Sequence, residues 1–273
     1  MSPSPTDRRL DEALPAPAVA PEAYTESYYR SGCMGAEAWA DSEGGQPHPM
    51  YRWYARLAQI EPGEVVVDVG CGRGELLVAA LEQGASRAIG VEYAPAAVEL
   101  AHRTLARHSS ATDAEVHTAD ARALPVEDAG ADLVTMLDVV EHLKPAELDR
   151  ALTEARRVLR PGGRLFVHTM PNRAIYTVTY RAMRAVRGHG WPADPRTDLE
   201  RRMHVNEQSL GSLRRSLRGA GFTGVRATLG HQVYDAFLPE PTARTWLHRL
   251  ASHRPTARLG RADLWAHAVR PDR

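Results

Sequence analysis

Short apolar runs alternate with amphipathic segments along the middle of the chain, from residue 65 to residue 169. Brief apolar runs bounded by turn residues are typical of strands buried on both faces, and apolar positions three and four apart are typical of helices. The runs that predict strands are 65–69, 87–91, 114–118, 131–137 and 164–169. The segments that predict helices are 75–83, 96–107 and 145–159.

This alternation predicts an α/β fold with a doubly wound sheet of parallel strands. Right-handed crossovers would place helices on both faces of the sheet. The pattern resumes nearer the end of the chain, with strands expected at 222–229 and 263–269 and helices at 207–218 and 242–250. We therefore expect a seven-stranded sheet in one domain over residues 23–273.

Three segments depart from this rhythm. Residues 1–22 are rich in proline, alanine and charge, which predicts a disordered arm. Aromatic residues crowd 23–60, which predicts an N-terminal cap over a sheet edge or over a pocket, either of this subunit or of a neighbour in a homodimer. Residues 172–204 are rich in arginine and predict either an inserted helical lid that recognises a polar or anionic acceptor, or a solvated helical surface.

The amino-acid composition argues against several classes of binding partner. The chain has 273 residues, with 34 basic and 34 acidic side chains, so no global positive field favours nucleic acid or an anionic membrane. Two cysteines, Cys33 and Cys71, cannot build a disulfide framework. No apolar run reaches the ~18 residues of a membrane span. The first residues lack the apolar core of a secretory signal. We expect a cytoplasmic protein that acts on a small molecule, without nucleic acid or membrane.

A glycine-rich turn joins the first predicted strand to the first predicted helix. It reads Asp68-Val69-Gly70-Cys71-Gly72-Arg73-Gly74. Glycine allows a sharp turn and close approach of a ligand to the main chain, and the N–H groups at a helix start favour a negative group. Glu92 ends the next strand about twenty residues later, where an acid can hold ribose hydroxyls. The combination predicts a cofactor that contains adenosine.

The spacing of the turn argues against a dinucleotide site, which usually reads Gly-x-Gly-x-x-Gly. Gly-x-Gly-x-Gly after Asp68 resembles the class I S-adenosylmethionine-dependent methyltransferases, which have a Rossmann-like sheet. Four further elements share the resemblance: Glu92, Ala119-Asp120-Ala121, Asp138-Val139-Val140-Glu141-His142-Leu143 and Leu159-Arg160-Pro161-Gly162-Gly163. The resemblance is strong over about residues 60 to 170 and includes the ubiquinone-biosynthesis and other small-molecule branches of the family.

The resemblance implies S-adenosylmethionine as the cofactor and a place for its methionine portion. Main-chain atoms at Gly70, Cys71 and Gly72 would contact this portion. Asp68 would orient the turn and the amino group of the cofactor. Leu137, with Asp138 beside it, would line the floor below the sulfonium.

The adenosine portion would lie beyond the second and third strands. The resemblance implies that Glu92 accepts hydrogen bonds from both ribose hydroxyls. Asp120 would accept one from the adenine amino group, with the Ala121 N–H near the ring. Tyr93 would lie against the adenine or pack in the core.

Glu141 and His142 follow the fourth strand, where the family places residues that face the substrate. An oxygen nucleophile must lose its proton during methyl transfer, either to a general base such as histidine or through a metal that lowers its pKa. We consider three interpretations. Glu141 and His142 form a general-base pair, or they cap the next helix and face solvent. The third follows from a resemblance of this element to the ubiquinone-biosynthesis O-methyltransferases and the small-RNA terminal 2′-O-methyltransferases, and implies that they bind a divalent metal together with Asp138 and His204.

These features predict an S-adenosylmethionine-dependent methyltransferase that acts on a small molecule. Oxygen is the expected acceptor atom, and a specialised metabolite or glycan the expected product class. The alternatives are N- or C-methylation of a small metabolite, metal-assisted 2′-O-methylation of RNA, a nucleotide-dependent oxidoreductase, and a binding module without catalysis.

Overall fold

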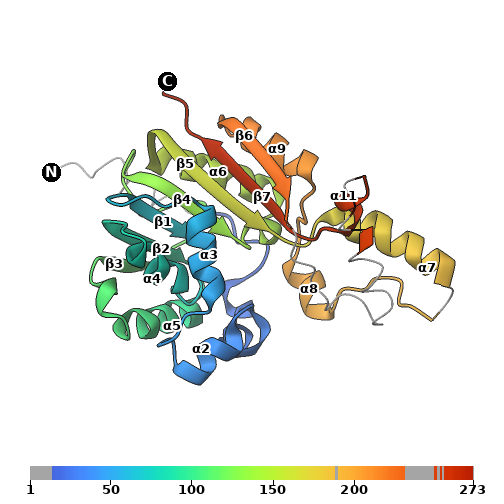
Figure 1. Cartoon of the computed structure of the whole chain (residues 1–273), viewed down its shortest axis with the longest axis horizontal. Helices are drawn as coiled ribbons and strands as arrows, with labels where there is room; N and C mark the ends of the chain where they lie inside the picture. Colours follow the sequence, from blue (N-terminus) through green and yellow to red (C-terminus); the bar gives the residue numbers. More distant parts are fainter. Residues whose placement is uncertain (1–13, 188–189, 231–248, 251–252, 254, 273) are drawn as a thin grey trace.

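The computed structural model describes residues 14–187, 190–230, 249–250, 253 and 255–272, and these form a seven-stranded sheet with the order β3-β2-β1-β4-β5-β7-β6 (Figure 1). The strands are β1 (Val65–Val69), β2 (Arg87–Glu92), β3 (Ala114–Thr118), β4 (Ala131–Leu137), β5 (Leu159–Thr169), β6 (Thr223–Leu229) and β7 (Leu264–Val269). The first five are parallel, and β7 runs antiparallel to its neighbours β5 and β6. The predicted α/β sheet is confirmed.

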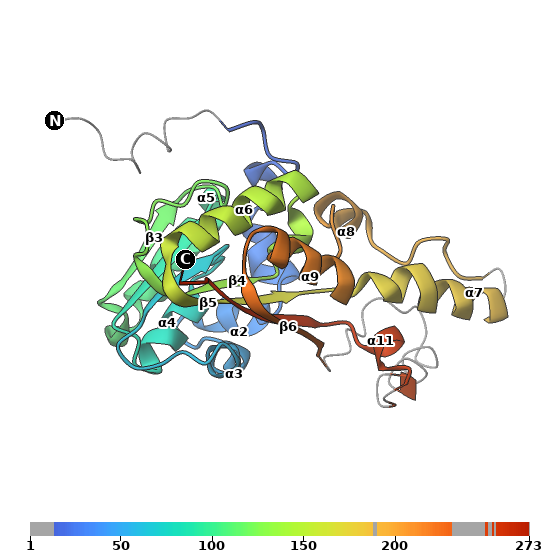
Figure 2. The ribbon, with the colours of Figure 1, turned by 90° about the horizontal axis from the view of Figure 1, so that it is seen from above.

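Helices cover both faces of this sheet (Figure 2). They are α3 (Pro49–Leu57), α4 (Glu75–Glu82), α5 (Pro95–Ala106), α6 (Pro145–Val158) and α9 (Leu210–Gly219). Leucines of α6 and α9 pack with β1, β4 and β5 on one face, and α3 and α4 pack on the other. Both α5 and α6 begin with proline, which has the backbone angle and the missing N–H that suit a first helical turn.

Two predicted helices differ from the expectation. The helix expected from residue 207 begins at Leu210, because the Ser209 hydroxyl accepts a hydrogen bond from the Ser212 N–H at 3.1 Å and starts the helix there. The helix expected over 242–250 lies almost wholly outside the described residues. No helix in the described ranges has the length and apolarity needed to cross a membrane.

The N-terminal segment covers the ends of the strands. It contains the short 3₁₀-helix η1 (Pro21–Ala23), the π-helix η2 (Tyr28–Gly32) and the α-helix α2 (Ala36–Ser42). We call residues 14–34 the N-terminal cover. Residues 1–13 of the expected disordered arm lie outside the described residues, but residues 14–22 are placed against the domain. Val19 is buried, and the Ala18 N–H donates to Glu147 at 2.8 Å. These contacts involve single residues, and the sequence around them has no regular spacing of apolar positions that would have predicted them.

The arginine-rich insertion is helical, as predicted, but its position differs from that of a lid. It holds η5 (Ile175–Tyr180), α7 (Arg181–Arg187) and α8 (Asp198–Met203). Helix α7 projects away from the sheet beside α11 (Ala257–Gly260), as both views show (Figures 1 and 2). Within the insertion Arg196 forms ion pairs with Asp194 and Glu207, at 2.7 and 2.5 Å. Arg196 therefore neutralises acids of its own neighbourhood instead of reaching toward the strand ends.

Candidate cofactor and acceptor site

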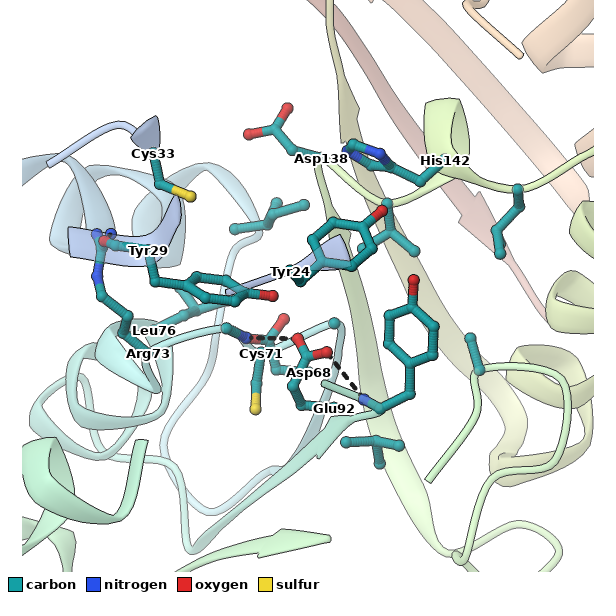
Figure 3. A pocket seen from close by; sticks show the side chains of 18 of the residues that line it. Tyr24, Tyr29, Cys33, Asp68, Cys71, Arg73, Leu76, Glu92, Asp138 and His142 are labelled. Carbon is teal, nitrogen blue, oxygen red and sulfur yellow. Dashed lines mark hydrogen bonds between the residues drawn. The ribbon is translucent and has the colours of Figure 1, made fainter. Parts of the chain in front are cut away.

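A deep pocket opens at the carboxyl ends of β1, β2 and β4 (Figure 3). All nine residues predicted to contact the cofactor line its wall. They are Asp68, Gly70, Cys71, Gly72, Glu92, Tyr93, Asp120, Ala121 and Leu137. The ends of parallel strands meet at one edge of a sheet, so residues up to 69 positions apart in the chain form one surface. The inserted segment 172–204 contributes no residue to the described wall of this pocket.

The turn after β1 requires glycine at its first position. Gly70 has a φ of +74°, and a Cβ atom there would lie 2.4 Å from a methyl carbon of Val139. Gly72 also has a positive φ, of +51°. The Gly70 N–H donates to the Val91 carbonyl at 2.7 Å. The main chain is thereby held between two strands and exposed to the pocket.

Glu92 links the end of β2 to this turn. One carboxylate oxygen accepts from the Gly72 N–H at 3.1 Å, and the other accepts from the N–H groups of Tyr93 and Ala94 at 2.8 and 2.9 Å. The residue is only 4% exposed, and burial raises its pKa despite the three N–H donors. Each carboxylate oxygen has two lone pairs, so three of the four are used and one, on the oxygen that accepts from Gly72, remains for a hydroxyl donor of a ligand.

Asp68 lies beneath the turn, at the carboxyl end of β1. Its carboxylate accepts from the Thr135 hydroxyl at 2.7 Å. Burial raises its pKa to about 7, and the hydrogen bond from Thr135 opposes this shift. A cationic amino group nearby would favour the ionised form.

Asp120 has a partner that sequence reasoning missed. Arg122 donates to both of its oxygens, at 2.9 and 2.8 Å. The same guanidinium lies 3.3 Å from Glu147. Asp120 is therefore a fixed, charge-paired group at the expected adenine position, and its lone pairs are shared with Arg122.

The N-terminal cover closes the pocket of its own subunit. The rings of Tyr24 and Tyr28 lie 5.6 Å apart, and those of Tyr24 and Tyr93 lie 5.5 Å apart, both in edge-to-face geometry. The Tyr93 hydroxyl donates to the Val19 carbonyl at 3.2 Å. The aromatic crowding noted in the sequence therefore forms a pocket wall.

Arg73, inside the glycine-rich turn, anchors this cover. Its guanidinium donates to the carbonyls of Tyr29 and Met34 at 2.6 and 2.9 Å. It also donates twice to Glu75, at 2.8 and 2.6 Å, and the two side chains are 2% and 1% exposed. One buried ion pair thus connects the expected cofactor turn to the cover. The only signal in the sequence was a charge between two glycines of a buried turn.

Glu141 and His142 have different partners. The Glu141 carboxylate is 1% exposed and accepts from the Thr169 hydroxyl at 2.7 Å. His142 lines the pocket, and its Nδ1 lies 3.0 Å from the Met203 carbonyl. The predicted pair is therefore divided, because only His142 is on the pocket wall and its ring is oriented by a backbone carbonyl. The solvent-facing alternative is contradicted for Glu141, which is buried.

These two residues also have opposite electrostatic environments. Burial and the charge of Asp138 raise the pKa of Glu141 to about 8. Burial and the neighbouring His204 lower the pKa of His142 to about 3. At neutral pH both groups are therefore predominantly uncharged.

Asp138 is the partly exposed member of a charged cluster whose other members, His168 and Asp263, are fully buried. Its carboxylate lies 2.9 Å from Nδ1 of His168, and Nε2 of His168 lies 3.2 Å from Asp263. Burial disfavours the charged imidazole, but the carboxylates of Asp138 and Asp263 outweigh it and raise the pKa of His168 to about 10. Burial would raise the pKa of Asp138, yet the charge of His168 holds it below its usual value. Asp138 is therefore an ionised carboxylate on the pocket wall.

Comparison with known proteins agrees with this geometry. Residues 66–163 match the family of methyltransferase domains. A probable S-adenosylmethionine-dependent methyltransferase of Mycolicibacterium smegmatis is 34% identical over 195 residues, which are 70% of this chain and 63% of that protein. The chain belongs to the class I S-adenosylmethionine-dependent methyltransferase family. The resemblance seen in the sequence is confirmed.

Two further proteins are similar to this chain, one in sequence and one in fold. The ubiquinone biosynthesis O-methyltransferase of Xanthomonas campestris is 32% identical over 147 residues, which are 50% of this chain and 57% of that protein. The chain spans less than two thirds of the length of these two relatives. The crystal structure of the cyclase SpnF has a TM-score of 0.62 at 18% identity, and covers 94% of this chain and 99% of that one. That last likeness concerns the fold alone.

The charged cluster under the methyltransferase pocket predicts a pH-dependent stability. His168 has a raised pKa, so its stabilisation is fully present below the ordinary value of 6.5 and is lost as the pH rises through about 10. We expect His168→Asn to lower the free energy of unfolding by about 2 kcal/mol at pH 7, because the buried Asp263 and the partly exposed Asp138 lose their cation. The difference from the wild type should shrink toward pH 10. Urea unfolding of the wild type and the variant at pH 7 and at pH 10 measures this difference in free energy. An equal difference at the two pH values would contradict the charged state of His168.

Proposed function

We propose that this protein transfers a methyl group from S-adenosylmethionine to a hydroxyl of a small molecule. The observation that supports the proposal is the convergence of the predicted cofactor positions on one pocket, with an aromatic cover and His142 on the remaining wall. S-adenosylmethionine, when bound, supplies an electrophilic methyl group for in-line displacement. The chain supplies position, exclusion of water and a proton acceptor.

His142 is the proposed proton acceptor. A carbonyl oxygen can only accept, so the Met203 carbonyl keeps the proton of the neutral ring on Nδ1 and leaves the lone pair on Nε2. Because its pKa is lowered to about 3, the ring is neutral over the whole physiological range. Such a weak base cannot fully deprotonate an alcohol beforehand. It can accept a hydrogen bond from the hydroxyl and take the proton as the methyl–oxygen bond forms, since the protonated ether is a much stronger acid.

Substitution of this histidine should separate turnover from cofactor binding. We expect His142→Ala to lower the rate of methyl transfer by about 10²-fold or more, as for loss of a general base. The affinity for S-adenosylmethionine should change little. The rate is measured as release of S-adenosylhomocysteine with hydroxyl-bearing acceptors found by screening. His117→Ala, on the half-exposed surface of β3, is the matched control and should retain full activity. Equal rates for the two variants would remove His142 from the chemistry.

A metal-assisted reaction is the second candidate. Ligand atoms of Glu141, His142 and His204 all lie within 4.8 Å of one another. Nδ1 of His204 is buried without a hydrogen-bond partner among the described residues. A carboxylate with two imidazoles fits Zn²⁺ or Mn²⁺ better than Mg²⁺, which prefers oxygen ligands. Asp138, which the sequence also suggested as a ligand, is paired with His168 instead.

This second candidate has its own test. A bound ion at these residues would lower the pKa of an acceptor hydroxyl and replace the need for a strong base. Titration of EDTA-treated protein with Zn²⁺ and with Mn²⁺ would then give one-to-one binding that His204→Ala abolishes, and EDTA would stop methyl transfer. Full activity in EDTA, with no saturable binding of either ion, would leave His142 acting alone.

A further inference from the structure

The charged groups around the pocket are strongly unequal in sign. Five carboxylates line it against two guanidinium groups. The carboxylates are those of Asp68, Glu92, Asp120, Asp138 and Glu147. Arg73 is paired with Glu75, and Arg122 is paired with Asp120 and Glu147. Among the described lining residues, no cationic side chain is therefore left to meet an anionic acceptor.

Part of this negative charge lies beside His142, at the end of the pocket where we expect the acceptor. Figure 3 shows Asp138 and His142 together at one end of the pocket, away from Asp68 and Glu92, where the cofactor is expected. His168 holds Asp138 ionised, but His168 lies between two carboxylates, so the cluster as a whole keeps a negative charge. Asp138 also has a φ of +53°, an unusual conformation for a residue other than glycine. Such strain is typical of functional positions.

Tyrosine side chains lie near Asp138 and His142. Tyr24, Tyr28 and Tyr54 all line the pocket. Tyr24 lies edge-to-face against His142 at 5.7 Å. Burial raises the pKa of the Tyr28 and Tyr54 hydroxyls, and the charge of Asp138 adds to this, so both tyrosines remain neutral. Aromatic faces beside a carboxylate are the surroundings that favour an ammonium group.

We propose that the acceptor is a small molecule with a protonated amine, which lies beside Asp138 and the tyrosine rings while its hydroxyl faces His142. The inference rests on the proposed function and deepens it by naming the substrate class. It also replaces the anionic acceptor that the arginine-rich insertion suggested, because that insertion does not line the pocket. The ammonium group donates to Asp138 and its positive charge interacts with the ring faces.

Three phenols of nearly equal shape test this proposal. Tyramine, 4-ethylphenol and 3-(4-hydroxyphenyl)propionate share the ring, hydroxyl and two-carbon arm and carry a positive, no and a negative charge at pH 7. The protein is first titrated with S-adenosylhomocysteine, and the saturated protein is then titrated with each phenol in a calorimeter. We expect tyramine to bind about tenfold more tightly than 4-ethylphenol, from its charge-assisted hydrogen bond and cation–π contacts. The carboxylate should bind most weakly.

The variant Asp138→Asn tests separately whether the Asp138 carboxylate causes the preference for tyramine. Asparagine keeps the shape and tolerates a positive φ, so the pocket should persist. We expect tyramine to lose most of its advantage over 4-ethylphenol, whereas Glu99→Gln on the exposed surface of α5 should preserve it. Tightest binding of the carboxylate, unchanged tyramine affinity in Asp138→Asn, or binding of none of the three would overturn the inference. Failure of S-adenosylhomocysteine to bind in the first step would instead overturn the proposed function.

Discussion

Replacement of Arg73 by methionine is expected to lower the free energy of unfolding by about 3–5 kcal/mol, because it leaves a buried carboxylate without its cation. Glu75 is 1% exposed at its side chain and cannot turn to solvent in place. The carbonyls of Tyr29 and Met34 lose their donor in the same variant. We therefore also expect weaker binding of S-adenosylmethionine, since the N-terminal cover loses its anchor on the glycine-rich turn. Urea unfolding and calorimetric titration measure the two effects.

An exposed ion pair of similar geometry provides the control. Arg52 donates twice to Glu82, at 2.7 and 3.0 Å, but its side chain is 48% exposed. Arg52→Met should cost less than about 1 kcal/mol, as for a solvent-screened pair. The double variant Arg73→Met, Glu75→Gln removes the unpaired buried charge and should recover part of the lost stability. If Arg73→Met costs no more than Arg52→Met, Arg73 does not anchor the cover.

Substitution of Gly70 by alanine is expected to weaken cofactor binding by tenfold or more, which corresponds to about 1.4 kcal/mol. A φ of +74° costs an alanine residue about 1 kcal/mol. Its Cβ atom would also lie 2.4 Å from Val139, so either the turn or the segment after β4 must shift. Both segments line the pocket, and their displacement moves the main chain that would contact the methionine portion. The affinity for S-adenosylmethionine is the measurement.

Two further variants distinguish the effect of the positive φ from the effect of the close contact with Val139. Gly63 has a φ of +87° with no atom within 4 Å of a built Cβ. Gly63→Ala should therefore lose stability through strain and keep its cofactor affinity. Val139→Ala combined with Gly70→Ala relieves the collision and should restore part of the affinity. If Gly63→Ala and Gly70→Ala weakened binding equally, the close contact with Val139 would have no role.

The sequence predicts the parts of this site that depend on neighbouring residues. The turn from Asp68 to Gly74 and the acid at Glu92 are local features at strand ends, and all the residues assigned to the cofactor from them line the pocket. The order of the alternating elements also predicts the sheet. Strand ends in a parallel sheet meet by topology, so these positions need no knowledge of individual long-range contacts.

Contacts between distant residues could not be predicted in this way. His168 and Asp263 are 95 positions apart, and Arg73 and Tyr29 are 44 apart. Only the packed structure shows that His168 is buried between two carboxylates, or that an arginine of the glycine-rich turn binds the cover. The arginine-rich insertion is a second example. Its charge pattern left a lid and a solvated helical surface as alternatives, and only the structure shows that Arg196 pairs with nearby acids and that α7 points away from the sheet.

The assignment of this pocket to S-adenosylmethionine is tested by a calorimetric titration of the purified protein with this cofactor. We expect saturable one-to-one binding. Glu92→Ala should weaken it by about 1–3 kcal/mol, because a ribose hydroxyl would lose its acceptor and the Gly72 N–H would lose its partner. Glu99→Ala on the exposed surface of α5 should bind as the wild type does. Absence of binding to the folded wild-type protein, or equal affinity in Glu92→Ala, would contradict the assignment of this pocket to the cofactor.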